Sequence, residues 1–162
     1  MILPIFEGII FSFVFLLVCV VDIQNGPVGG VHFYEQDVKD RVVELGLITR
    51  EKIKKNLMLS GTVLWLFLIF LFPLAVFLVN GVASFLEGFI QLTIIFLIGG
   101  VFDRVFIDWY WVGHTKAWLI PGTEDLMPYI PKSACIRKWA GTIILYPILA
   151  AILSWVYSEI LF

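Results

Sequence analysis

The chain has 162 residues, of which 60% are hydrophobic and 15% are charged, and its formal net charge is −2. Because ordinary globular chains carry about a quarter charged residues, this composition excludes a typical soluble domain. The small net charge also argues against a nucleic-acid partner. The hydrophobic residues form uninterrupted runs of membrane-spanning length, which predict an integral membrane protein surrounded by a lipid bilayer.

The first predicted span covers residues 2–21. A helix of about 20 residues rises about 30 Å, which matches the hydrocarbon core of a bilayer. No Lys or Arg precedes this run and no small-residue cleavage site follows it, so we expect a retained span rather than a cleaved signal peptide. Glu7 lies within the span, near its N-terminal end.

A polar connector, residues 22–56, follows the first span. Its second half predicts two helices, because Gly46 suits the position after one helix and Thr49 suits the N-cap of the next. The first of these helices has apolar side chains on one face, so we expect an amphipathic helical hairpin lying against the bilayer. A DNA-reading helix-turn-helix is disfavoured, because basic charge is not in excess and the second helix enters the membrane. His32, in the glycine-rich part of the connector, is expected to be exposed.

Three more spans are predicted, and they are joined by an uncharged Asn80-Gly81 turn and by a second connector at residues 106–138. Pro73 deletes a backbone hydrogen bond and predicts a kink in the second span. Gly99-Gly100 predicts a close approach of two helices in the third. The expected fold is all-α, a single membrane domain over residues 1–162 with the helical hairpin between its first two spans. The last three spans are residues 57–79, 82–105 and 139–161.

All 11 Lys and Arg residues lie on the two connectors or where these join the spans. Four spans place both connectors on one side of the membrane and both termini on the other. The positive-inside rule then makes connectors 22–56 and 106–138 cytoplasmic and places the termini outside a plasma or inner membrane. The two cysteines, Cys19 and Cys135, have no metal or disulfide spacing, and Cys135 would face a reducing compartment.

The first candidate site lies on the second connector and at the end of the third span. His114 near Asp108 or Asp125 can act as a general base or a metal ligand, because a carboxylate fixes the imidazole tautomer and raises its basicity. Arg104 can also pair with Asp108 at i,i+4 spacing. The alternative is structural, since Trp and Tyr gather at membrane interfaces and mixed charges are ordinary in a solvated loop. The walls of such a site would be two tryptophans, Trp111 and Trp118.

The second candidate site lies on the opposite side, where Glu7, Glu87 and Glu159 sit on three different spans. No basic residue on that side neutralises them. Converging carboxylates can bind a cation or share a proton, and Gln91 lies one turn deeper than Glu87 on the same face. The alternative is that the glutamates reach headgroup water. That alternative is favoured for Glu159, whereas Glu87 is expected to be an intramembrane carboxylate.

The sequence contains no Walker A, GxSxG, HExxH or paired CxxC motif, so two classes of function stay open. The first is a non-enzymatic transport, channel or partner subunit that binds through Glu87, Gln91 and Glu7. The second is a small enzyme acting on a lipid or isoprenoid at the cytoplasmic interface, with His114 as base or ligand. The sequence leaves the cofactor and the metal undetermined. Four spans bury a slim interior, so we expect a homo-oligomer or a larger membrane complex.

Overall fold

A computed structural model describes residues 2–161, and all regular structure within this range is helical. Four helices are long and apolar enough to cross a membrane, and they cover Ile2–Ile23, Arg50–Val79, Phe85–Val112 and Lys132–Leu161. Within them the α-helical parts are α1 (Ile2–Ile23), α3 (Arg50–Leu66), α4 (Phe72–Leu74), α5 (Phe85–Phe102), α6 (Lys132–Ala140) and α7 (Tyr146–Leu161). The all-helical prediction and the four apolar helices are thereby confirmed.

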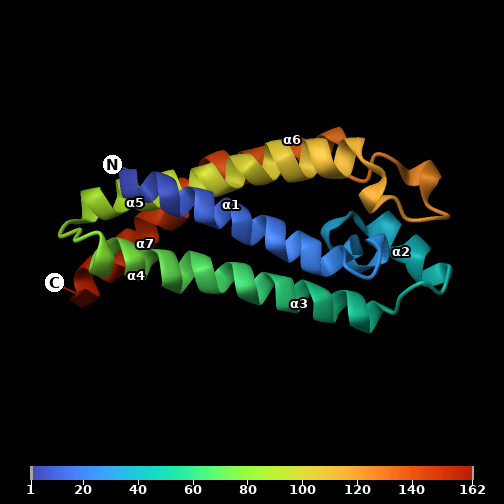
Figure 1. Cartoon of the computed structure of the whole chain (residues 1–162), viewed down its shortest axis with the longest axis horizontal. Coiled ribbons are helices and arrows are strands. Elements are labelled where there is room, and N and C mark those ends of the chain that lie inside the picture. Colours follow the sequence, from blue (N-terminus) through green and yellow to red (C-terminus); the bar gives the residue numbers. More distant parts are fainter. Residues whose placement is uncertain (1, 162) are drawn as a thin grey trace.

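The helices form an elongated bundle with two distinct ends (Figure 1). Both termini and the turn between α4 and α5 lie at one end, which we call the terminal end. The short helix α2 (Gln36–Glu44) and the connector that follows η4 (Asp103–Val112) lie at the other, the connector end. Large apolar side chains such as Phe13, Met58 and Trp155 are 57–62% exposed on the bundle surface. An apolar outer surface of this kind is suited to contact with lipid.

Helix starts and ends follow the expected local chemistry. The Thr49 hydroxyl accepts from the Lys52 backbone N–H at 3.3 Å, as an N-cap does. Gly46 follows α2 with φ of 69°, a left-handed conformation that favours glycine. Around Pro73 the helix widens into π-helical segments, η2 (Phe67–Leu71) and η3 (Ala75–Val79). Proline cannot donate to the preceding turn, so the disturbance falls where the sequence predicts it.

Helix α5 lies between α1 and α7 and packs closely against both. A Cβ added at Gly99 would lie 2.3 Å from Cδ1 of Phe11 on α1, and one at Gly100 would lie 2.6 Å from Cε2 of Tyr146 on α7. These glycines therefore allow the close approach expected of them. Phe11 is fully buried, and its ring lies 5.1 Å from that of Phe72.

The expectation that His32 is exposed is wrong, since only 3% of this residue is exposed. It lies in the 3₁₀ helix η1 (Pro27–Phe33), which folds back over the end of α1. Its Nδ1 is 3.1 Å from the Gly29 carbonyl oxygen, and its Nε2 is 3.4 Å from Oδ2 of Asp22. The Ser60 hydroxyl donates to the same Asp22 oxygen at 2.8 Å. This network ties η1 to both α1 and α3, which is why the connector folds inward here.

Ion pairs join the two connectors at their surface. Both terminal guanidinium nitrogens of Arg41 on α2 donate to the Asp125 carboxylate, at 3.0 and 3.1 Å. On the other side of the connectors Arg137 donates to Glu35 at 2.7 Å. The hydrogen bond from Arg41 holds the pKa of Asp125 below its usual value. The second connector is thus fastened over the end of the bundle, where it covers the candidate site.

Candidate functional site

The connector end of the bundle holds a partly buried network of two acidic and two basic side chains. Arg104, on the π-helical segment η4, donates to Asp103 on one side and to Asp108 on the other. Lys138 on α6 donates to the second oxygen of Asp108 at 2.9 Å. The three η4 side chains are only 12–14% exposed, and Lys138 is 29% exposed. The network contains two formal negative and two formal positive charges, so it is balanced.

Helix geometry accounts for how this network assembles. Positions four apart on a helix share a face, which brings Arg104 onto Asp108 as the sequence predicts. Lys138 comes from α6, 30 positions further along the chain. The pairing of Asp108 with two cations therefore joins the helix that runs through α5 and η4 to the last long helix. Removing one member would leave an uncompensated buried charge, which is costly in a low-dielectric interior.

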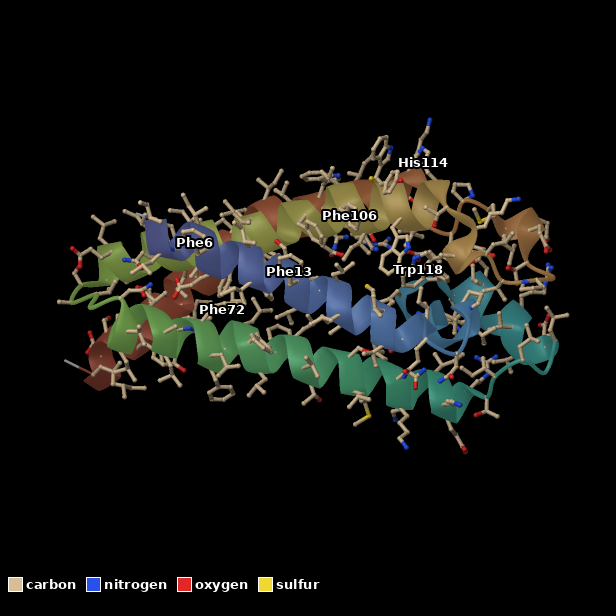
Figure 2. The ribbon with its side chains drawn as sticks, viewed as in Figure 1. Phe6, Phe13, Phe72, Phe106, His114 and Trp118 are labelled. Carbon is tan, nitrogen blue, oxygen red and sulfur yellow. The ribbon has the colours of Figure 1, made fainter. Side chains whose placement is uncertain are left out.

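The network forms one wall of a cavity of about 250 Å³, which we call the charged cavity. The rest of its wall is mainly apolar and aromatic, and Tyr34 and Trp118 close it from the connectors. Figure 2 shows Trp118 on the inner side of the helix that ends at Val112. Trp118 fits there only because Gly30 has no side chain, since a Cβ at Gly30 would lie 2.4 Å from the Trp118 ring. The lining also includes Phe15, Val18, Cys19, Phe33, Leu64 and Tyr146.

The two predicted wall tryptophans have related positions. Trp118 is 1% exposed and packs edge to face with Trp111, with ring centroids 5.1 Å apart. Trp118 lines the charged cavity, whereas Trp111 packs against the Trp118 ring and does not line the cavity. Trp109, by contrast, is 62% exposed and points away from the bundle. The tryptophans at the connector end therefore differ: Trp109 is exposed on the outer surface, whereas Trp118 forms part of the cavity wall.

His114 lies on the outer side of the same helix end (Figure 2) and is exposed. Its Nδ1 is 2.6 Å from the Trp109 carbonyl oxygen, so Nδ1 is the donor in a hydrogen bond between them. His114, Asp108 and Arg104 all line a second hollow of about 390 Å³, the His114 groove. Asp108 makes its hydrogen bonds to Arg104 and Lys138 and none to His114 among the described residues.

Asp125, the other predicted partner of His114, is placed elsewhere. It is an exposed residue that binds Arg41 through both oxygens. The structure therefore brings His114 and Asp108 to one groove without a direct contact, and it assigns Asp125 to the fastening between the connectors. The roles suggested for these residues in catalysis stay predictions.

At the terminal end, two of the predicted binding residues, Glu7 and Gln91, are connected through Asn80. The Asn80 side-chain amide donates to Glu7 at 3.0 Å and to Gln91 at 2.8 Å. Glu87 is exposed in the first turn of α5, where its carboxylate accepts from the Ala83 backbone N–H at 3.4 Å. The Ser84 hydroxyl in turn accepts from the Glu87 N–H. This reciprocal arrangement is a form of capping box and accounts for Glu87 without a ligand.

Glu159 is also exposed, as the sequence favours. Within residues 2–161 no three His, Cys, Asp or Glu side chains are placed to hold one metal ion. The use of Glu7, Gln91 and Glu87 as a binding site stays a prediction, and the carboxylate best shielded from solvent among the three glutamates is that of Glu7 rather than Glu87.

Several residues of the charged cavity were missed by sequence reasoning, above all Lys138, Tyr34 and Cys19. In the sequence, Lys138 looks like one of several cations beside the membrane, and Tyr34 looks like part of a polar loop. One signal was available. Asp103 and Arg104 lie inside the predicted third span, where ionisable side chains are costly and need partners.

No protein-family model, curated protein or solved structure matches this chain. The function must therefore be argued from the geometry of its own residues.

Proposed function

We propose that this chain is an integral membrane protein that binds a small ligand in the charged cavity and acts as a transport, channel or partner subunit. Both connectors would lie on the cytoplasmic side and both termini outside, as the distribution of basic residues favours. The observation that carries the proposal is the partly buried, charge-balanced network of four ion-paired side chains beside a cavity, formed by Asp103, Arg104, Asp108 and Lys138.

Two arguments connect this network to ligand binding. Ionisable side chains within candidate membrane spans are costly, and they usually mark a substrate or ion pathway. Helix packing does not require them, because well-packed apolar side chains of similar volume stabilise a fold as well as a buried ion pair or better. The bundle already has a well-packed aromatic core around Phe11, so the charged network serves another purpose.

Native mass spectrometry of the purified chain in nanodiscs tests the binding proposal. We expect wild type to retain a small non-covalent adduct from its membrane, and the Lys138→Met variant to lose it. Arg137→Met is the matched control, because Arg137 is the neighbouring cation but is 67% exposed and binds Glu35 at the surface. A wild type without an adduct, or an adduct that Lys138→Met retains, contradicts the proposal.

The proposed orientation is tested with the cysteines of the chain itself. Cys135 is exposed on α6. In a Cys19→Ser background, a membrane-impermeant maleimide should label Cys135 in inside-out vesicles but not in intact cells. A cysteine at Ala83, introduced without the two natural cysteines, should show the opposite pattern because it lies on the turn at the terminal end. Labelling of Cys135 in intact cells would reverse the proposed topology.

A second candidate function rests on the His114 groove. There His114 presents an oriented Nε2 beside Asp108 and Arg104, which suits a small membrane enzyme acting on a lipid or isoprenoid at the cytoplasmic interface. Incubation with a membrane lipid extract should then give a product with wild type and none with His114→Ala. Equal product from both proteins, or product from neither, removes this candidate and leaves the binding proposal standing.

A further inference from the structure

Three buried hydrogen-bond donors around the charged cavity lack an acceptor among the described residues. They are the Tyr34 hydroxyl, the Trp118 Nε1–H and the Arg104 Nε–H. All three residues line the cavity, and Tyr34 and Trp118 are only 3% and 1% exposed. Buried polar groups are almost always hydrogen-bonded in native proteins, so three together at one cavity point to a partner that enters it.

The chemistry of these donors limits what that partner can be. An indole N–H and a guanidinium N–H can only donate. Burial raises the pKa of the Tyr34 phenol, and Tyr129, Cys19 and Asp108 act in the same direction. Tyr34 therefore keeps its proton at any physiological pH and can donate as well. A ligand that satisfies the three groups must bring acceptor atoms, such as carbonyl, ether or hydroxyl oxygens.

The charge balance limits the ligand further. Each carboxylate of the network is already paired with Arg104, and Asp108 is paired with Lys138 as well. An anionic ligand would leave the site with a net negative charge, and a cationic ligand would leave it with a net positive charge, both of which are costly in a shielded interior. An uncharged head meets neither obstacle. The cavity of about 250 Å³ is larger than an engineered cavity of about 150 Å³ that binds benzene, so a substituted ring or a group of similar size fits.

A second hollow shows where the rest of such a ligand can lie. An apolar groove of about 310 Å³, the α1–α3 groove, runs between α1 and α3 and is lined by residues that include Leu17, Val63 and Phe67. Val18 lines both this groove and the charged cavity. On α3, Val63 lines the groove and the adjacent Leu64 lines the cavity. The two hollows therefore adjoin on both helices, and the groove faces the apolar outer surface of the bundle.

We propose that the charged cavity binds the uncharged, acceptor-bearing head of an amphiphile, with Tyr34, Trp118 and Arg104 as donors, while its hydrocarbon chain lies in the α1–α3 groove. This inference rests on the proposed function and names the class of ligand for the same site. The donors recognise the oxygens of the head, the aromatic side chains enclose it, and the ion-pair network excludes charged analogues.

A series of decyl amphiphiles tests this inference with the chain in nanodiscs. The probes share a ten-carbon chain and differ in the head, which is a neutral quinone, an anionic phosphate or a cationic ammonium group. Binding is taken as the amount retained above empty nanodiscs, measured by quantitative mass spectrometry. We expect retention of the quinone alone. No retention of the quinone, or stronger retention of either charged probe, overturns the inference.

The variant Tyr34→Phe removes one donor and leaves the ring in place. Loss of one hydrogen bond of ordinary strength should weaken quinone binding about fivefold or more. The matched control is Tyr110→Phe, because Tyr110 is 50% exposed and lies outside the cavity wall. Equal binding by wild type and Tyr34→Phe contradicts the assignment of Tyr34.

The stability of the same variants separates a ligand donor from a structural hydroxyl. Without ligand, Tyr34→Phe removes a hydroxyl that has no partner within residues 2–161, so its unfolding temperature should equal or exceed that of wild type. Tyr129→Phe should lower it, because the Tyr129 hydroxyl accepts from the Ile120 N–H at 3.0 Å and bonds the Thr123 hydroxyl. A lower unfolding temperature for Tyr34→Phe contradicts the inference. Retention of a charged probe that Lys138→Met abolishes would refute the neutral head but support the proposed function.

Discussion

Replacing Gly99 by alanine tests whether α1 and α5 are in contact at the core of the bundle. The new Cβ would lie 2.3 Å from Cδ1 of Phe11, where ordinary contacts between such atoms lie at 3.4–4 Å. Phe11 cannot turn aside, because it is fully buried with its ring 4.6 Å from that of Phe15 and 5.1 Å from that of Phe72. The two helices must therefore move apart, which loosens the contacts along both.

The magnitude follows from two opposing terms. Overpacking a core costs about 1–3 kcal/mol, and exchanging a helical glycine for alanine returns up to about 1 kcal/mol of helix propensity. We expect Gly99→Ala to lose about 1–2 kcal/mol of unfolding free energy, which lowers Tm by roughly 2–8 °C for a chain of this length. Thermal unfolding in one detergent, followed by circular dichroism, measures the shift.

The control is Gly61→Ala on α3, where an added Cβ meets nothing within 4 Å. Gly61→Ala adds only the higher helix propensity of alanine, so its Tm should equal or exceed that of wild type. A Gly99→Ala protein as stable as Gly61→Ala would mean that α1 and α5 are not in close contact at Gly99.

Two further predictions concern the connectors. His32 and Asp22 form a close buried pair, because Nε2 of His32 lies 3.4 Å from Oδ2 of Asp22. His32→Leu should lower the unfolding free energy by about 3–5 kcal/mol, because it leaves the Asp22 carboxylate buried and unpaired. The double variant His32→Leu/Asp22→Leu lacks that carboxylate and should lose less unfolding free energy than the single variant. Additive losses in a double-mutant cycle of thermal unfolding would refute the pair. The second prediction concerns Asp125, whose pKa is lowered by its hydrogen bond from exposed Arg41. A lowered carboxyl pKa contributes stability that is present above the unfolded value of about 4 and lost as the pH falls through the folded one. Wild type should therefore exceed Asp125→Asn in Tm at pH 6, and the difference should shrink as the pH falls below the unfolded value. A difference that does not depend on pH would exclude the ion pair as its source.

The sequence alone determined the parts of this protein that depend on neighbours along the chain. Runs of apolar residues are long enough to make the four helices, whatever packs against them. Caps and turns at Thr49 and Gly46 follow from local hydrogen bonds and from the left-handed backbone that glycine tolerates. The pairing of Arg104 with Asp108 needs only helical spacing.

Tertiary structure decided the site, because its chemistry comes from segments far apart in the chain. Asp108 meets Lys138 only because α6 returns beside η4, and His32 is buried only because η1 folds over Asp22 at the end of α1. Burial is a property of what covers a residue, and periodicity along one helix does not reveal it. For the same reason the hydrogen bond from the Ala83 N–H to Glu87, at the start of α5, could not be read from its place in the predicted span. A charge acquires its role from whichever helix or loop lies opposite it, and in this chain that partner is set by the packing of the bundle.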